Sequence, residues 1–341
     1  MPPVNETVAI AVVQLCSSQD VSLSLAQLSS VLAELKPGAV DAIFLPENFA
    51  ALAAPSAHQI GLAEAEGPGL IRNFIAKKAI ETGAYIFAGT VPLAKRADGQ
   101  MVPGQKVRAA SLVFDPCGAE IARYDKQHLF DVDVQDQIGR YRESDTFEPG
   151  DAPRVVATAF GTVGLSVCYD LRFPEFFTRL TALGAEIIAV PSAFTAVTGA
   201  AHFEVLVRAR AIENACFLVA ACQSGGHDSG RETFGHSMVV SPWGEVLACR
   251  EAGPGAFFLQ RWIFKIFAAY ARRSHRGVGQ QLLIVQAFKV LKELAIGFCR
   301  SALGHCCLFC LRITNDGSKR LPVERGITLP QFSDYEGIGR Q

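Results

Sequence analysis

The sequence predicts a layered α/β domain with mixed β-sheets over residues 8–250. Short apolar runs alternate there with segments of helical periodicity, a pattern that favours strands joined by helices. Two hairpin signatures, each a pair of short strands around a turn that contains Pro and Gly, interrupt this alternation and add antiparallel strands. Half of the residues are hydrophobic and 19% are charged, as expected for a folded globular chain.

The expected elements follow in chain order. The expected strands are short apolar runs, at residues 8–15, 42–45, 85–91, 163–167, 187–191 and 217–221. The expected helices carry apolar residues at helical spacing, at residues 21–35, 70–82, 175–183 and 202–213. Lys36-Pro37-Gly38 ends the first of these helices and Gly83 ends the second. The hairpins comprise residues 111–124 and 236–249.

Polar residues lie at or near the ends of several expected strands. Glu47, Lys126 and Cys168 each follow an expected strand closely, and Glu143 lies in a loop. Strand ends in an α/β sheet are where residues distant in the sequence assemble into a site. We therefore single out these four residues as candidates for one site.

These residue types suit hydrolysis by a thiol. A thiol becomes a good nucleophile once it is deprotonated, which needs a base or a field that lowers its pKa. A carboxylate can take that proton and later pass it to a leaving amine. An ammonium and a backbone N–H can stabilise the oxyanion of a tetrahedral intermediate, by roughly 3–4 kcal/mol for a good donor. A second carboxylate near the ammonium keeps it charged.

The same residues also have common structural roles. A cysteine after an apolar strand is usually a core residue, a glutamate there is usually a cap or solvated, and a loop lysine is usually on the surface. Spacing alone therefore leaves both interpretations of Glu47, Lys126, Glu143 and Cys168 open.

Longer motifs around these residues resemble the signature motifs of the nitrilase superfamily of carbon–nitrogen hydrolases. The motifs are Pro46-Glu47-Asn48 and residues 124–130 (YDKQHLF), 143–150, 167–175 (VCYDLRFPE), 191–194 (PSAF), 202–204, 208–214 and 235–244 (GHSMVVSPWG). They occur in the family's order and cover about residues 8–256. Several motifs in sequence are far more specific than any one of them.

The resemblance implies a four-layer α-β-β-α sandwich and a role for each candidate residue. It implies that Cys168 is the nucleophile and that Glu47 is the general base and later the general acid. It further implies that Lys126 binds the oxyanion together with the backbone N–H of Tyr169. Glu143 is then the carboxylate that positions Lys126 or the substrate, and the family is usually dimeric through helices next to the nucleophile.

Within the superfamily, the motifs most resemble the deaminated-glutathione amidase branch, with the ω-amidases as the neighbouring branch. The resemblance implies a small substrate that carries an α-keto acid amide, with 2-oxoglutarate and cysteinylglycine as products. Another amide or carbamoyl hydrolase is the alternative within the superfamily, because pocket walls decide the substrate class. A non-catalytic scaffold with altered assembly is the alternative of a different class.

Several further residues are candidates for substrate binding. Arg172 is placed to pair with a substrate carboxylate, and a structural salt bridge with Asp170 or Glu175 is an equally supported interpretation. The candidate pocket walls are Phe194, Thr195 and Thr198, for which packing and turn roles fit as well.

The resemblance stops shortly after residue 256. Residues 1–256 carry 19 basic and 28 acidic residues, a balance of −9, whereas residues 257–341 carry 13 and 5, a balance of +8. We predict a hydrolase domain at residues 1–256 and a divergent tail at 257–341 that is mostly helix or loop, with no role assigned. Relatives often use this region as an arm against the dimer mate, so we expect the tail to weaken or alter a homodimer.

Other classes of protein are disfavoured. The net charge of −1 gives no overall attraction to nucleic acid, and no apolar run reaches the roughly 18 residues of a membrane span. We expect no signal peptide, so the ten cysteines indicate free thiols and a cytoplasmic location. His305 and the neighbouring cysteines match no zinc-site spacing, and no metal or cofactor is expected.

Overall fold

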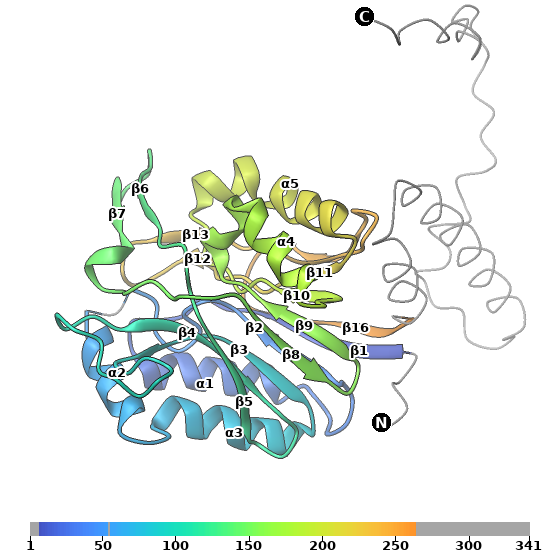
Figure 1. Cartoon of the computed structure of the whole chain (residues 1–341), viewed down its shortest axis with the longest axis horizontal. Coiled ribbons are helices and arrows are strands. Elements are labelled where there is room, and N and C mark those ends of the chain that lie inside the picture. Colours follow the sequence, from blue (N-terminus) through green and yellow to red (C-terminus); the bar gives the residue numbers. More distant parts are fainter. Residues whose placement is uncertain (1–6, 54, 264–341) are drawn as a thin grey trace, which may run out of the picture. The chain divides into compact units, whose positions relative to one another are not determined.

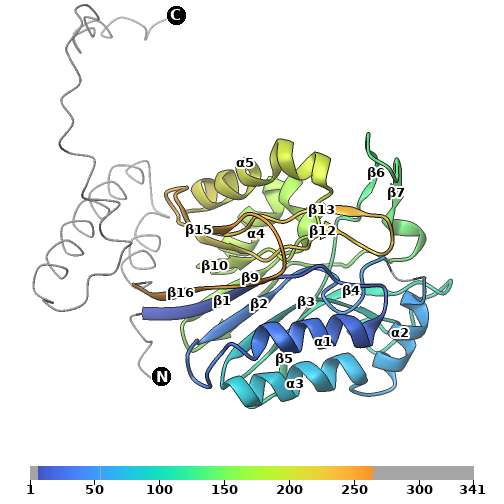
Figure 2. The same ribbon diagram turned by 180° about the vertical axis from the view of Figure 1, so that it is seen from behind.

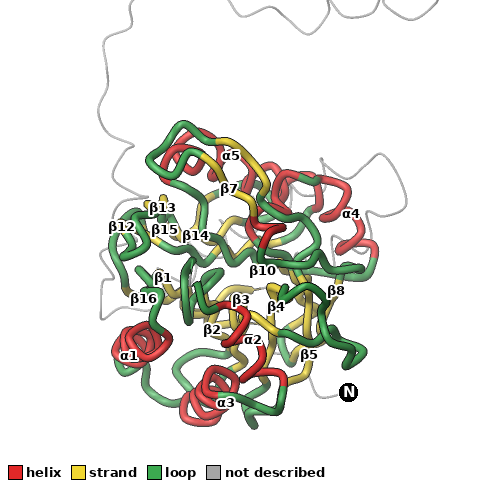
Figure 3. Tube along the Cα trace, turned by 90° about the vertical axis from the view of Figure 1, so that its left-hand side faces the viewer, coloured by secondary structure: helices red, strands yellow, loops and turns green. Residues whose placement is uncertain are grey.

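The computed structural model describes residues 7–53 and 55–263 of the chain. Two six-stranded sheets pack face to face, and helices cover their outer faces (Figures 1 and 2). In the end-on view of Figure 3, the helices on one side are α1 (Val21–Leu32), α2 (Ala57–Ala65) and α3 (Leu70–Thr82), and those on the other are α4 (Pro174–Ala182) and α5 (Ala196–Asn214). The predicted four-layer α-β-β-α sandwich is confirmed.

The first sheet has the strand order β16-β1-β2-β3-β4-β5. Its strands are β1 (Thr7–Gln14), β2 (Ala42–Leu45), β3 (Tyr85–Leu93), β4 (Arg108–Phe114), β5 (Glu120–Asp125) and β16 (Gly255–Ile263). Strands β1, β2 and β3 are parallel to one another, whereas β4, β5 and β16 each pair antiparallel with a neighbour. The predicted hairpin thus forms one edge of the sheet, and β16 forms the other.

The second sheet has the order β15-β14-β11-β10-β9-β8. Its strands are β8 (Arg154–Thr158), β9 (Gly161–Leu165), β10 (Ile187–Ala189), β11 (Phe217–Ala220), β14 (Ser237–Val240) and β15 (Val246–Arg250). Two short ribbons, β6 (Asp131–Asp133) with β7 (Arg140–Arg142) and β12 (Ser224–Gly226) with β13 (Glu232–Phe234), stand apart from both sheets. Two 3₁₀ helices, η1 (Glu143–Asp145) and η2 (Cys168–Arg172), follow β7 and β9.

The main core lies between the sheets and under the helices. Strands that are covered on both faces have continuous apolar sequences, as in β2 (AIFL), where every residue is buried. The rings of Phe44 and Phe87 stack with their centroids 4.5 Å apart. Burial of these faces fixes the spacing of the two sheets, and thereby the positions of the loops at the strand ends.

Local capping explains where the helices begin and end. The side chain of Asp20 accepts a hydrogen bond from Leu23 N–H and starts α1, which ends three residues before the predicted position. Gly83 ends α3 as predicted, in the left-handed conformation at φ +66°. The side chain of Thr195 caps α5, so this helix begins at Ala196, six residues before the predicted start.

The predicted boundary at residue 256 falls within a strand. β16 runs from Gly255 to Ile263 and pairs antiparallel with β1 along its length. The rest of the predicted tail, including His305 and the nearby cysteines, lies outside the described residues, so its helical or loop character stays a prediction. Within the part of the chain that the structure covers, no helix is both long and apolar enough to cross a membrane.

Gly89 allows β3 to approach the end of β2 closely. Its φ is +21°, and a Cβ at this position would overlap the carbonyl oxygen of Pro46, which precedes Glu47. We expect Gly89→Ala to lower the free energy of unfolding by roughly 2–3 kcal/mol, because strand backbones must separate to accept the methyl group. Urea denaturation followed by circular dichroism measures this change.

Gly99→Ala is the matched control for this substitution. Gly99 also has a positive φ, of +87°, but no heavy atom lies within 4 Å of the added Cβ. It should cost only about 1 kcal/mol, from backbone strain alone. Equal losses for the two variants would contradict a close approach at Gly89.

Candidate active site

An ion-pair network joins three of the predicted residues. Lys126 directly follows β5, and its Nζ donates hydrogen bonds to Glu47 Oε1 at 2.8 Å and to Glu143 Oε2 at 2.8 Å. Glu47 lies just after β2, and Glu143 begins η1. The structure thus brings together three side chains that are far apart in the sequence.

Lys126 is a buried cation held between two carboxylates. Its side chain is 1% exposed. Burial alone would lower the pKa of Lys126, but the negative charges of Glu143 and Glu47 outweigh it and raise that pKa well above its ordinary value. Lys126 therefore stays an ammonium throughout the physiological range.

Glu143 is fixed by backbone as well as by Lys126. Its Oε2 accepts a hydrogen bond from Phe130 N–H at 2.6 Å. Burial, and then the charge of Glu47, raise the pKa of Glu143, whereas Lys126 and the Phe130 N–H lower it. The position of this carboxylate is set before any ligand binds.

Cys168 begins η2 in a strained conformation beside this network. Its φ is +46°, a left-handed value that is uncommon outside glycine, and its N–H donates to Pro191 O at 2.9 Å. Burial first, and the Glu47 charge second, raise the pKa of the Cys168 thiol; Lys126 and a hydrogen bond from Ala193 N–H act against them. The Glu47 carboxylate is therefore the negative charge that acts on the Cys168 sulfur.

Asp170 holds the turn that carries Cys168. It is fully buried and accepts hydrogen bonds from Val167 N–H and from the Tyr124 hydroxyl, both at 2.8 Å. Its other oxygen lies 2.6 Å from His128 Nδ1. From the sequence, Asp170 was named only as a partner for Arg172. Its role in holding the turn could have been inferred from Tyr124 and His128, the polar residues on either side of Lys126 that it contacts.

Among the described residues, Arg172 forms neither of the two alternative structural salt bridges, with Asp170 or with Glu175, and Asp170 pairs with His128 instead. The Arg172 guanidinium lies over the rings of Tyr169 and Phe194, 5.9 and 5.8 Å from their centroids. A substrate carboxylate as its partner stays a prediction.

The predicted pocket walls take structural positions. Phe194 is buried beneath Arg172. Thr195 is fully buried and caps α5, and its hydroxyl lies 2.8 Å from that of Thr198. Contact of these three residues with substrate stays a prediction.

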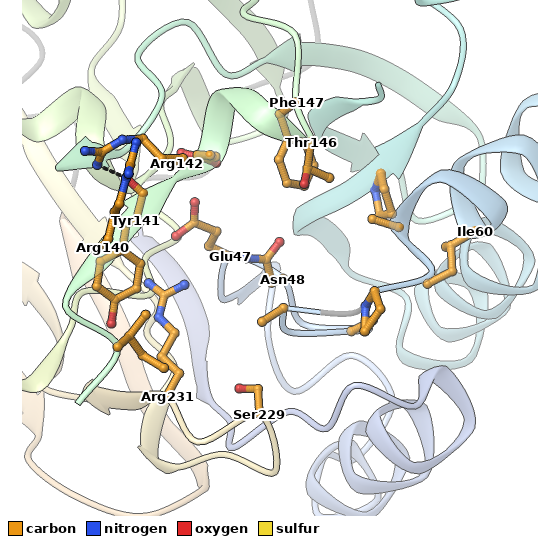
Figure 4. A pocket seen from close by; sticks show the side chains of 17 residues that line it. Glu47, Asn48, Ile60, Arg140, Tyr141, Arg142, Thr146, Phe147, Ser229 and Arg231 are labelled. Atoms are coloured by element: carbon orange, nitrogen blue, oxygen red, sulfur yellow. Dashed lines mark hydrogen bonds between the residues drawn. The ribbon is translucent and has the colours of Figure 1, made fainter. Parts of the chain in front are cut away.

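A cavity of about 380 Å³ opens onto Glu47 and Glu143 (Figure 4). Asn48, Ile60 and Phe147 line one part of it, and other lining residues come from β7 and from the turn between β12 and β13. Sequence reasoning missed the polar and aromatic residues that these segments supply, which are Arg140, Tyr141, Arg142, Ser229 and Arg231. Among the described residues, no group of His, Cys, Asp and Glu side chains is arranged to hold a metal ion.

A family model described as carbon-nitrogen hydrolase matches residues 9–255, most of the chain. The chain belongs to the carbon–nitrogen hydrolase family. It is therefore a hydrolase that acts on carbon–nitrogen bonds other than peptide bonds, as the sequence motifs predicted.

Two curated relatives of this hydrolase are named deaminated glutathione amidase. The protein from Yersinia enterocolitica is 44% identical over 238 residues, which are 70% of this chain and 81% of that protein. The protein from Homo sapiens is 39% identical over 247 residues, which are 72% and 74% of the two chains.

Solved structures show the same fold. The Caenorhabditis elegans NitFhit protein superposes with a TM-score of 0.69 at 32% identity; the match covers 80% of this chain but less than two thirds, 64%, of the other. Saccharomyces cerevisiae Nit3, a member of the nitrilase superfamily, superposes with a TM-score of 0.68 at 23% identity, over 82% of this chain and 98% of that one.

Removal of the buried ammonium should destabilise the hydrolase in a pH-dependent way. Lys126→Met leaves Glu47 and Glu143 without their shared cation, at a cost of about 3–5 kcal/mol near neutral pH. The pKa of Glu143 then rises further, because the lowering contribution of Lys126 is lost. A carboxyl group whose pKa is raised by folding stabilises the folded protein while it is protonated, and this stabilisation is lost as pH rises. The loss in free energy of unfolding caused by Lys126→Met should therefore be larger near pH 8 than near pH 5.

Urea denaturation of the two proteins at both pH values measures this deficit. Lys77→Met is the control, because Lys77 is 75% exposed and pairs only loosely with Glu81, at 3.8 Å. It should change stability by less than about 0.5 kcal/mol at either pH. A pH-independent loss for Lys126→Met would argue against two carboxylates that depend on one cation.

Proposed function

We propose that this hydrolase cleaves the amide bond of deaminated glutathione to give 2-oxoglutarate and cysteinylglycine. The observation that carries the proposal is the Glu47–Lys126–Glu143 network, which lies beside a cavity of about 380 Å³ and whose Glu47 and Lys126 charges act on the Cys168 thiol. The similarity to two proteins of that name over most of their length supports the choice of substrate.

Acylation begins with the Cys168 thiol. Because its pKa is raised, the sulfur must lose its proton as it attacks the amide carbonyl carbon, and Glu47 accepts that proton. The carbonyl oxygen becomes an oxyanion. When the intermediate collapses, the C–N bond breaks, Glu47 returns the proton to the leaving amine, and an acyl thioester remains on Cys168.

Two groups bind the oxyanion in this proposal. An ammonium has three N–H donors, and Glu47 and Glu143 orient Lys126 so that a donor remains for the substrate. The N–H of Tyr169 lies in the first turn of η2, where N–H groups have no acceptor within the helix. Both donors act on charge that develops in the transition state.

Deacylation uses the same residues in reverse. Water attacks the thioester carbon while Glu47 accepts one of its protons. The second tetrahedral intermediate collapses, the C–S bond breaks, and the proton returns from Glu47 to the Cys168 sulfur. The carboxylic acid product leaves, and the thiol is restored. Glu143 acts as a positioning residue, because it touches Lys126 rather than the reacting atoms.

Release of 2-oxoglutarate from deaminated glutathione tests the proposed function. The purified full-length protein should release it in a coupled assay, and Cys168→Ala should release none. Glu47→Gln should lower kcat roughly 10²–10⁴-fold, because proton transfer is lost while the thiol remains. If the folded wild-type protein hydrolyses other ω-amides but not deaminated glutathione, the proposed substrate is wrong. Hydrolysis by Cys168→Ala would overturn the mechanism.

We also propose that the enzyme forms a homodimer through α5. Val205 and Ile212, seven residues apart on one helical face, are 69% and 52% exposed. The same helix contacts η2, because Arg210 Nε donates to Leu171 O at 3.0 Å. A partner on this face would therefore restrain the turn that carries Cys168.

Reduced thiols support the cytoplasmic location that we propose. The cysteines in the described part of the chain, among them the buried Cys216 and Cys222, are all free. Proteins exported to oxidising compartments commonly pair such residues as disulfides.

Val205→Asp should shift the protein from dimer to monomer in size-exclusion chromatography with light scattering. A charge on an exposed position leaves the fold intact but is costly within an apolar interface. Ile80→Asp is the control, because Ile80 is 61% exposed on α3, in the opposite helical layer. The proposed α5 interface is wrong if both variants remain dimers or if the wild-type protein is a monomer.

A further inference from the structure

The cavity contains a cation that the mechanism above does not use. Arg231 lies in the cavity wall close to Glu47, at the end of the turn between β12 and β13 (Figure 4). Its guanidinium lies over the ring of Tyr141, 5.3 Å from the centroid. One of its Nη atoms donates to the carbonyl of Ala193, two residues after Pro191, whose carbonyl accepts the hydrogen bond from Cys168 N–H. Arg231 is therefore tied to the segment that contacts the nucleophile.

The polar atoms of this turn are incompletely paired. No carboxylate in the described part of the chain forms an ion pair with Arg231, and its Nε is buried without a hydrogen-bond partner there. The hydroxyl of Ser229, two residues earlier, is also buried without a partner among those residues. Buried donors in native proteins nearly always have an acceptor. Both residues line the same cavity, so a ligand that enters it can supply one.

The turn is held rigidly in place. His227 N–H donates to Arg231 O at 2.9 Å and closes the turn. The His227 ring lies 2.9 Å from Ser17 O and 2.8 Å from Thr233 Oγ1. Asp228 accepts a hydrogen bond from Ser18 Oγ. Arg231 and Ser229 are thus positioned before a ligand arrives, which reduces the entropic cost of binding.

The charges around the cavity favour an anionic ligand at Arg231. Glu47, Glu143 and Lys126 together carry a formal charge of −1, which would repel an anion. Arg140 and Arg142 also line the cavity, but Arg140 is exposed to solvent and Asp133 pairs with Arg142 at 2.8 Å. Arg231 therefore provides unpaired positive charge on the cavity wall to offset that repulsion.

We propose that Arg231, assisted by Ser229, binds a carboxylate of the substrate and makes the enzyme selective for anionic amides. The proposal rests on the amidase function proposed above and adds a specificity-determining site to it. Guanidinium and carboxylate form charge-assisted hydrogen bonds with defined geometry, so the site orients the substrate as well as attracting it.

Two thiol reagents test the site without requiring turnover. Iodoacetate and iodoacetamide alkylate sulfur by the same reaction. They differ only in that the first carries a carboxylate where the second carries an amide. The rates at Cys168 are measured on the full-length protein by peptide mass spectrometry, with the exposed Cys117 as an internal reference. The ratio of the two rates cancels changes in thiol reactivity and reports the effect of the carboxylate on the rate.

Arg231→Gln should lower the iodoacetate-to-iodoacetamide ratio at Cys168 about tenfold, and Ser229→Ala should lower it about threefold. Arg142→Gln is the matched control and should leave the ratio unchanged, because Arg142 is already paired. The ratio at Cys117 should not change in any variant. If Arg231→Gln fails to fold, Ser229→Ala tests the proposal in its place. The conservative Arg231→Lys, which keeps the positive charge, should retain most of the ratio. An unchanged ratio in folded Arg231→Gln, or in Ser229→Ala if Arg231→Gln does not fold, overturns the proposal.

Kinetics with deaminated glutathione separate this proposal from the proposed function. Arg231→Gln should raise KM about tenfold while kcat changes little, because the lost contact is present in both bound substrate and transition state. If the iodoacetate-to-iodoacetamide ratio falls in Arg231→Gln but the wild type does not hydrolyse deaminated glutathione, that substrate is rejected and the carboxylate site is supported. Hydrolysis with KM and ratio both unchanged in Arg231→Gln rejects the carboxylate site and keeps the function.

Discussion

The structure around the site depends on one buried ammonium shared by two carboxylates. Lys126, Glu47 and Glu143 come from three separate segments, after β5, after β2 and at the start of η1. A buried charge is costly unless it is paired at close range, so these segments have little freedom to move apart. The same requirement that stabilises Lys126 therefore also sets the geometry in which a substrate oxygen can be bound.

A third carboxylate, that of Asp170, joins the two sheets at this point. Asp170 lies in the turn after β9 of the second sheet, and it accepts a hydrogen bond from Tyr124 in β5 of the first. Tyr124 is two residues before Lys126, and Asp170 is two residues after Cys168. The nucleophile and the oxyanion donor are therefore held in register by the contacts of Asp170 with Tyr124 and His128, and the site exists only when both sheets have packed.

Much of this arrangement could be predicted from the sequence, and the features that could not be predicted depend on contacts between distant residues. Strands flanked by turn residues and the stop at Gly83 depend on local chemistry, so they could be predicted, as could the candidates Glu47, Lys126 and Cys168 from motifs. The first turn of α5 was missed because its residues (AVTGAA) form helix weakly without the Thr195 cap. Arg231 was missed because its neighbours are typical of a surface turn. The contacts that place this turn, from His227 to Ser17 and from Arg231 to Ala193, join residues far apart in the sequence.

The pairing of β1 with β16 makes the order of synthesis matter for this protein. Thr7 is registered with Ile263, so β1 receives this neighbour only after nearly all the other described strands have been made. At typical elongation rates that interval is roughly 10–50 s. During it, β1 (TVAIAVVQ) presents an apolar strand with an unpaired edge, the kind of surface that binds other chains. We therefore expect the edge of β1 to need protection from other chains until Ile263 has emerged.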